Sequence, residues 1–216
     1  MRMRKKPNLI PRMERCGRVQ IKEPEALRGR WLAELGLWRE LHLELGCGKG
    51  KFTVETAAQN PDILLAAVEK VPDAMVVGME RACAMELQNV RFIDRDVLKL
   101  PEIFAPGEVS RIYLNFSDPW PRNRDRDRRL TAPGFLELYR RVLRPGGEIH
   151  FKTDNVPLFD FSLRSFEKCG WTLSQVTRDL HENGPCGVMT DYESKFYEQG
   201  VHINRCVAVY TGEETQ

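Results

Sequence analysis

Short apolar segments typical of β-strands alternate with helical segments along most of the chain. The strand-like segments are 41–45, 63–69, 90–93, 111–116 and 148–153. The helical segments are 50–60, 72–88, 133–143 and 158–168, with a Pro-Gly-Gly turn expected at 145–147. Strands that alternate with helices form βαβ units, in which helices cover a parallel sheet. The pattern therefore predicts an α/β fold with a mainly parallel, twisted sheet and helices on both faces.

Two more strand-like segments, 172–177 and 201–210, close the chain. Only a loop and a short helix separate them, rather than the crossover helix that joins parallel neighbours. The C-terminal edge of the sheet is therefore expected to be antiparallel.

The composition indicates a soluble protein with an apolar core, because 42% of the residues are hydrophobic and 30% are charged. The longest apolar runs, such as Ile63–Val68, are too short to cross a bilayer, so we expect no membrane contact. No apolar stretch follows the basic start, which argues against a signal peptide. The six cysteines are scattered singly, a pattern that argues against a metal site and for a reducing cytoplasm.

Positive charge is concentrated at the N-terminus. Residues 1–30 hold ten Lys or Arg and three Glu, although the whole chain carries only +2. We therefore divide the chain into a basic arm over residues 1–37 and a domain over residues 38–216. A basic arm in front of an acidic body favours a polyanionic partner. The alternative is a solvated, disordered N-terminal segment.

A glycine-rich turn, Glu-Leu-Gly-Cys-Gly-Lys-Gly, follows the first predicted strand at residues 44–50. Gly46 and Gly48 would let the backbone pass close to a nucleotide-like ligand. The phosphate-binding pattern GxxxxGK[ST] is absent, and Lys51 stands where a dinucleotide fingerprint needs its third glycine. Glu69 ends the second strand, where its two oxygens could accept both ribose hydroxyls of an adenosine. The alternative for Glu69 is an ordinary surface acid.

S-adenosylmethionine fits this turn better than a dinucleotide does. It carries no phosphate and two positive groups, so it tolerates an acid such as Glu44, which would repel a pyrophosphate. Asp96, or its neighbour Asp94, follows the third strand, where a carboxylate could meet the exocyclic amine of adenine. The alternative for Asp96 is the N-cap of the next helix.

The segment Asn-Phe-Ser-Asp-Pro-Trp-Pro at 115–121 directly follows the fourth strand. It lies at the carboxyl end of the sheet, where α/β proteins bind ligands. The prolines restrict the backbone around Asp118, and Trp120 offers a surface on which an extruded base could stack. Alternatively, Asp118 is a turn former and Trp120 covers the core. Five arginines and two aspartates follow within residues 122–129, and the planar guanidinium suits phosphate contacts.

Several motifs occur in an order that resembles the bacterial tRNA (guanine-N7)-methyltransferase family. They are NFSDPWP, an Arg-rich stretch ending in RRL-T, IHFKTDN and MT-x-YE-x-KF, and the match extends from about Leu41 to Tyr210. The resemblance implies a class I methyltransferase fold of Rossmann-like type. It also implies transfer of a methyl group from S-adenosylmethionine to N7 of the variable-loop guanine at position 46 of tRNA. The sequence leaves open whether the protein is a monomer or a homodimer.

The same resemblance assigns roles to individual residues. It implies that Glu44, Glu69, Asp96 and Asp118 contact the cofactor, and that Asp118 is also catalytic. It implies substrate binding by the following residues: Arg122, Asp154, Thr190, Asp191, Tyr192 and Glu193. Asp125 and Asp127 depart from the family, whose members often carry His and Lys there, which leaves the strength of phosphate binding open.

Three alternatives remain from the sequence. Asn115 to Trp120 faintly resembles the motif of methyltransferases that act on exocyclic amines, although Asp-Pro-Trp replaces Pro-Pro-aromatic. The chain could also be an inactive, cofactor-binding RNA-binding protein, against which the retained acids argue. A Rossmann-type dehydrogenase is disfavoured by Lys51.

Overall fold

The computed structural model describes residues 5–36 and 38–211. Its centre is a seven-stranded sheet in the order β3-β2-β1-β4-β5-β7-β6. The strands are β1 (Glu40–Leu45), β2 (Ile63–Val68), β3 (Val90–Ile93), β4 (Val109–Asn115), β5 (Leu143–Thr153), β6 (Thr172–Thr177) and β7 (Asn204–Val209). The α-helices are α1 (Leu9–Arg15), α2 (Trp31–Leu35), α3 (Lys51–Gln59), α4 (Pro72–Ala84), α5 (Leu100–Ile103), α6 (Pro133–Arg140), α7 (Val156–Lys168) and α8 (Asp191–Glu198).

The first five strands are parallel, and the last two form an antiparallel edge. β1 pairs with β2 and β4 in parallel, while β7 runs antiparallel to both β5 and β6. In the part of the chain that the structure describes, β6 pairs only with β7. The mainly parallel sheet with an antiparallel C-terminal edge, predicted from the sequence, is confirmed.

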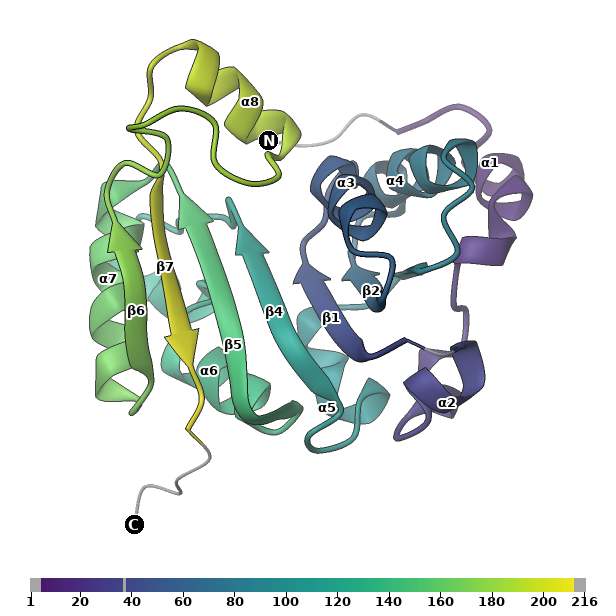
Figure 1. Cartoon of the computed structure of the whole chain (residues 1–216), viewed down its shortest axis with the longest axis horizontal. Helices are drawn as coiled ribbons and strands as arrows, with labels where there is room; N and C mark the ends of the chain where they lie inside the picture. The colour runs from purple at the N-terminus through teal and green to yellow at the C-terminus, as the bar shows by residue number, and fades with distance from the viewer. Residues whose placement is uncertain (1–4, 37, 212–216) are drawn as a thin grey trace.

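Alternation along the buried strands gives the sheet two apolar faces. In β2, Leu64 and Ala66 join a core cluster with residues of α5, α6 and α7, whereas Leu65 and Ala67 join a second cluster with α3 and α4. Successive side chains of a strand point to opposite faces, so a continuous apolar run is what a strand covered on both faces requires. Figure 1 shows α3 and α4 beside β1 and β2, and α8 beyond the carboxyl ends of β4 and β5.

Several boundaries differ from the prediction: for example, the helix expected over 133–143 ends at Arg140 and the strand expected over 201–210 is Asn204–Val209. Two of the differences arise from backbone conformation. α4 ends at Ala84 rather than near residue 88, and Glu86 has a positive φ of 53° that a helix cannot continue through. The expected turn at 145–147 lies inside β5. Gly146 adopts a φ of 75° and donates its N–H to the carbonyl of Tyr210 at 2.6 Å, so the strand continues through an irregularity.

The described part of the basic N-terminal segment packs on the body. Arg12 donates two hydrogen bonds to Glu80 of α4, and Val19 is fully buried against the α3–α4 side. Trp31 of α2 is fully buried in the other core cluster, and its indole N–H donates to the carbonyl of Ile103 at 3.1 Å. These contacts contradict the alternative of a solvated segment for residues 9–36. Residues 1–4 and 37 of the predicted arm lie outside the described residues.

Two further features of the described residues concern membranes and metals. None of the helices within 5–36 and 38–211 has both the length and the apolar character to cross a membrane. Within the same ranges, no three His, Cys, Asp or Glu side chains are gathered so that they could hold a metal ion.

Candidate active site

The glycine-rich turn after β1 fixes the carboxylate of Glu69 at the end of β2. The N–H of Gly48 donates to Oε2 of Glu69 at 3.0 Å, and the N–H of Val71 donates to Oε1 at 2.9 Å. Gly46 and Gly48 have φ angles of 78° and 56°, and a Cβ added at either would meet no atom within 4 Å. The space over the turn is therefore open. Burial raises the pKa of Glu69, although the two N–H donors act in the opposite direction.

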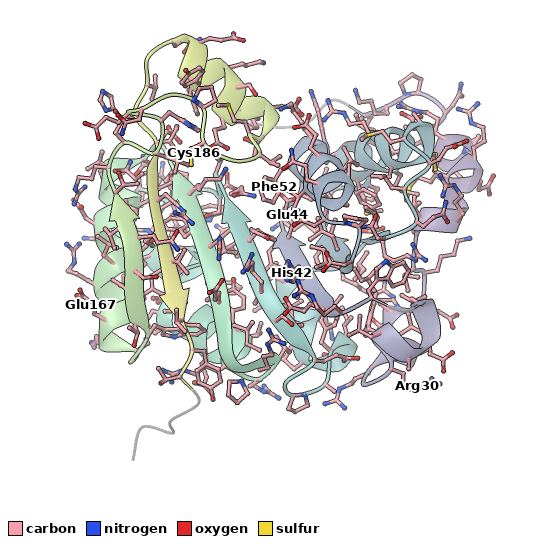
Figure 2. All side chains as sticks on the ribbon, in the orientation of Figure 1. Arg30, His42, Glu44, Phe52, Glu167 and Cys186 are labelled. Carbon is pink, nitrogen blue, oxygen red and sulfur yellow. The ribbon has the colours of Figure 1, made fainter. Side chains whose placement is uncertain are left out.

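Glu44, the penultimate residue of β1, is turned into the protein. Its Oε2 accepts from the hydroxyl of Thr53 on α3, and its Oε1 accepts from Nδ2 of Asn115 at the end of β4, at 3.1 Å. Burial raises the pKa of Glu44 to about 7. Figure 2 shows Glu44 and Phe52 together where β1 meets α3. Glu44 thus joins the two strands between which the strand order reverses, the usual ligand-binding position of such sheets.

The loop after β4 combines unusual backbone angles with unpaired polar atoms. Phe116 and Trp120 have φ angles of 53° and 41°, which bulky residues rarely adopt outside functional sites. Asp118 between them is exposed. Oδ1 of Asn115 and Oγ of Ser117 are buried without a hydrogen-bond partner. Buried polar atoms without a partner are uncommon, so these two atoms indicate a place where a ligand donates or accepts.

Two of the five arginines after this loop contact the loop itself. The guanidinium of Arg128 lies 3.5 Å from the ring centroid of Trp120. Arg129 donates to the carbonyls of Pro119 and Trp120, both at 3.0 Å. One face of Trp120, the surface expected to stack on a base, is therefore covered by Arg128.

The other charged groups of residues 122–129 face solvent or pair with each other. Arg122, Arg124 and Arg126 are exposed. Asp125 pairs with Arg124 at 3.9 Å and with Arg128 at 3.6 Å, and Asp127 pairs with Arg126 at 3.6 Å. The aspartates that depart from the family pattern thus neutralise part of this surface.

The residues around α8 divide into buried and accessible groups. The hydroxyl of Thr190 accepts from the N–H of Glu193, and the carboxylate of Glu193 accepts from the N–H of Thr190, which forms a capping box. Glu193 is fully buried, whereas Tyr192 is 59% exposed. Asp191 accepts from Arg81 of α4 at 2.9 and 3.2 Å. Asp154, which follows β5, is partly exposed.

Asp96 is the third residue after β3. It is exposed, and its carboxylate accepts from the N–H of Leu98 at 3.0 Å as the N-cap of a 3₁₀ helix, η3 (Val97–Lys99). This is the capping arrangement that the sequence left open. The adjacent Asp94 is partly buried, and burial raises its pKa.

Sequence reasoning missed several side chains that hold the site together. Thr53 and Asn115 hold Glu44, and Lys152 and His181 hold Glu193 through contacts of 2.6 and 3.1 Å. One signal was present in the sequence: Lys152 stands between Phe151 and Thr153 near the carboxyl end of a predicted strand of the sheet. Such a lysine needs a buried partner, because an unpaired charge is rarely buried.

The fold agrees with that of solved methyltransferases. The 16S rRNA methyltransferase KamB superposes with a TM-score of 0.62 at 18% identity, over 81% of this chain and 89% of that chain. TrmN from Thermus thermophilus gives a TM-score of 0.56 at 22% identity, over 80% of this chain and 44% of that chain. A family model described as "Putative methyltransferase" matches residues 39–206. The fold is that of a class I, Rossmann-like methyltransferase.

Relatives with similar sequences identify the family within this class of methyltransferases. A tRNA (guanine-N(7)-)-methyltransferase of Geobacillus thermodenitrificans is 44% identical over 210 residues, which are 97% of each chain. One of Halalkalibacterium halodurans is 42% identical over 217 residues, 100% of this chain and 99% of the other. The chain belongs to the tRNA (guanine-N(7)-)-methyltransferase family. The resemblance noted in the sequence is confirmed.

Proposed function

We propose that this protein transfers a methyl group from S-adenosylmethionine to N7 of a guanine in tRNA, at position 46 of the variable loop. Membership of the family supports the reaction. The main structural support for a cofactor site is the carboxylate of Glu69, which accepts hydrogen bonds from the N–H groups of Gly48 and Val71. Open space lies beside it at the carboxyl edge of the sheet. A tRNA-modifying enzyme of this kind belongs in the cytoplasm, as a monomer or a homodimer.

The residues at this edge fit S-adenosylmethionine. Each carboxylate oxygen of Glu69 accepts one hydrogen bond from a backbone N–H. Its second lone pair could accept a hydrogen bond from a ribose hydroxyl. Glu44 is a buried acid whose ionised form a cationic ligand would favour, and Asn115 Oδ1 and Ser117 Oγ lack partners. We assign Gly46 and Gly48 to cofactor binding as well. We assign Asp96 to a contact with the adenine of the cofactor. When bound, the cofactor supplies an electrophilic methyl group on a sulfonium.

The remaining residues would recognise tRNA. We assign exposed Arg122 to a phosphate, and Tyr192 and the partly exposed Asp154 to the nucleotide. Thr190 and Asp191 shape the start of α8 beside them. Glu193 would act indirectly, because its carboxylate is fully buried and bonded within the protein.

Methylation at N7 requires no general base. The N7 lone pair lies in the plane of the ring and carries no proton, so the protein's task is alignment and electrostatic support. The carboxylate of Asp118 or Asp154 would accept from the N1–H and the amino group of guanine. This interaction strengthens as the ring becomes cationic, and it therefore stabilises the transition state more than the ground state. We assign the catalytic role to Asp118.

Replacing N7 by C–H tests the chemistry with almost no change in shape. tRNA with 7-deazaguanine at the target position should bind about as well as normal tRNA and accept no methyl group. Mass spectrometry of normal tRNA should locate 7-methylguanine at position 46. Transfer of radiolabelled methyl to the deaza nucleotide would instead identify an exocyclic-amine methyltransferase. A binding protein would methylate neither RNA.

A further inference from the structure

The segment between β6 and β7, residues 178–203, crosses the carboxyl edge of the sheet and is attached there by a buried charged cluster. Nζ of Lys152 in β5 donates to Oε2 of Glu193 at 2.6 Å and to the carbonyl of Val188 at 3.0 Å. Nε2 of His181 lies 3.1 Å from Oε1 of Glu193. Lys152, His181 and Glu193 are all buried. Figure 2 shows Cys186, from the same segment, near the ends of β4 and β5.

The tautomer of His181 is fixed by its second contact. Its Nδ1 accepts from the N–H of Cys186 at 3.2 Å, so the proton of the neutral ring lies on Nε2 and points to Glu193. Glu193 therefore receives hydrogen bonds from a lysine, a histidine and the backbone of Thr190. Buried ion pairs give little net stability, and their best-established use is to fix one arrangement of the chain. Here the fixed arrangement is that of residues 188–193.

The cluster of Lys152, His181 and Glu193 also connects residues 178–203 with the two loops that carry Asp118 and Asp154, the residues assigned to guanine. Lys152 stands two residues before Asp154, and its carbonyl accepts from the N–H of Phe116, two residues before Asp118. The ring of Phe116 in turn packs on Phe196 of α8, with centroids 6.0 Å apart. A displacement of Lys152 or Glu193 would therefore move α8 relative to Asp118 and Asp154 together.

Two further contacts tie the segment to the other half of the sheet, and both are more exposed. Lys51 of α3 donates to the carbonyl of Met189 at 3.0 Å, and Arg81 of α4 pairs with Asp191 at 2.9 Å. Their side chains are about a third exposed, whereas those of Lys152 and Glu193 are 10% and 0% exposed. The fixed attachment of the segment is therefore at β5.

We propose that Lys152 is a positioning residue for guanine recognition: by holding Glu193 and the carbonyl of Val188, it places Thr190–Tyr192 beside Asp118 and Asp154. This inference rests on the proposed function and adds to it a residue that does not itself touch the base. The fully buried carboxylate of Glu193 then acts through Thr190 and α8.

The test uses the Lys152→Met variant of the full chain. Methionine preserves the approximate length of the side chain and removes its charge. We expect its KM for tRNA to rise about tenfold or more, while the Kd for S-adenosylmethionine changes by less than about twofold. Lys168→Met, an exposed lysine at the end of α7, is the matched control and should resemble wild type. Because Lys152→Met leaves a buried charge unpaired and can impair folding, Glu193→Gln and Lys152→Met/Glu193→Gln are measured as well. The double variant should be no worse than the single variants, since the two residues act as a unit.

Hydrogen exchange separates this inference from the proposed function. Peptides from residues 181–200 should exchange faster in the Lys152 and Glu193 variants, and peptides from α3 and α4 should not. An unchanged KM for tRNA in folded variants would overturn the positioning role, as would an equal loss of cofactor affinity. Failure of the wild-type enzyme to form 7-methylguanine would instead overturn the proposed function, and the exchange result would still report the attachment.

Discussion

At the scale of single residues, Glu69 is prepared for a ligand before any ligand binds. Its two backbone hydrogen bonds orient the carboxylate, so little order is lost when a diol binds. Glu69→Ala should weaken S-adenosylmethionine binding by about 1.5–3 kcal/mol, the range for hydrogen bonds to a charged group. Isothermal titration calorimetry measures this change. Glu167→Ala, an exposed acid on α7 (Figure 2), is the control and should leave the affinity unchanged. An unaltered Kd in Glu69→Ala would remove Glu69 from the cofactor site.

Glu44 makes stability depend on pH in a defined direction. Its pKa is about 7 in the folded protein and near 4.5 in a free side chain. Between these pH values the unfolded chain has released a proton that the folded protein retains, so the contribution of Glu44 to stability falls as pH rises. Glu44→Gln imitates the protonated form. Its unfolding free energy should exceed that of wild type by about 1 kcal/mol at pH 5 and by about 3 kcal/mol at pH 8. Urea unfolding at both pH values tests this, and an equal difference at both would contradict it.

At the scale of elements, periodicity predicted the strands and helices well, because burial on one or two faces leaves a local pattern. The strand over 90–93 and the β6 segment have the predicted bounds. The site was predicted less completely. The turn beside Glu69 follows from glycine spacing, but the burial of Glu44 and Glu193 depends on partners far away in the sequence. Thr53 and Asn115, or Lys152 and His181, meet those acids only after the sheet has formed.

The short helix α2 illustrates an element whose importance the sequence did not reveal. Trp31 lies in the segment predicted to be a basic arm, yet it is fully buried with its ring 5.0 Å from that of Phe104. Trp31→Ala should lower the unfolding free energy by about 3–5 kcal/mol, as for other buried aromatic residues. Trp31→Phe, which retains most of the volume, should lose less. Thermal unfolding compares the two variants, and equal losses would show that volume is not what matters there.

At the scale of the whole molecule, the small net charge conceals an uneven surface. Arg122, Arg124 and Arg126 are exposed beside the candidate site, whereas Arg128 and Arg129 are engaged with the loop. Replacing the first three by Ala should reduce the slope of log K for tRNA against log salt by about 2–3, since each phosphate contact contributes about 0.7–0.9.

The control for this charge change is a triple variant of the exposed arginines Arg39, Arg144 and Arg164, which lie just before β1, near the start of β5 and on α7. It removes the same charge and should leave the slope nearly unchanged. Fluorescence anisotropy over a series of KCl concentrations gives both slopes. Equal slopes in the two triple variants would indicate that tRNA senses only the overall charge of the protein.

The order of the strands also has a consequence for biosynthesis. The last strand, β7, lies between β5 and β6, and in the described residues it provides the only pairing of β6. During synthesis on the ribosome, residues 172–177 therefore have no partner strand until Asn204–Val209 have emerged. A nascent chain that stops before residue 204 would leave the edge of β5 exposed and β6 unpaired, and the segment that carries Glu193 would be joined to the domain at one end alone. The buried contacts that place α8 thus reach their final arrangement only after β7 has been synthesised and paired.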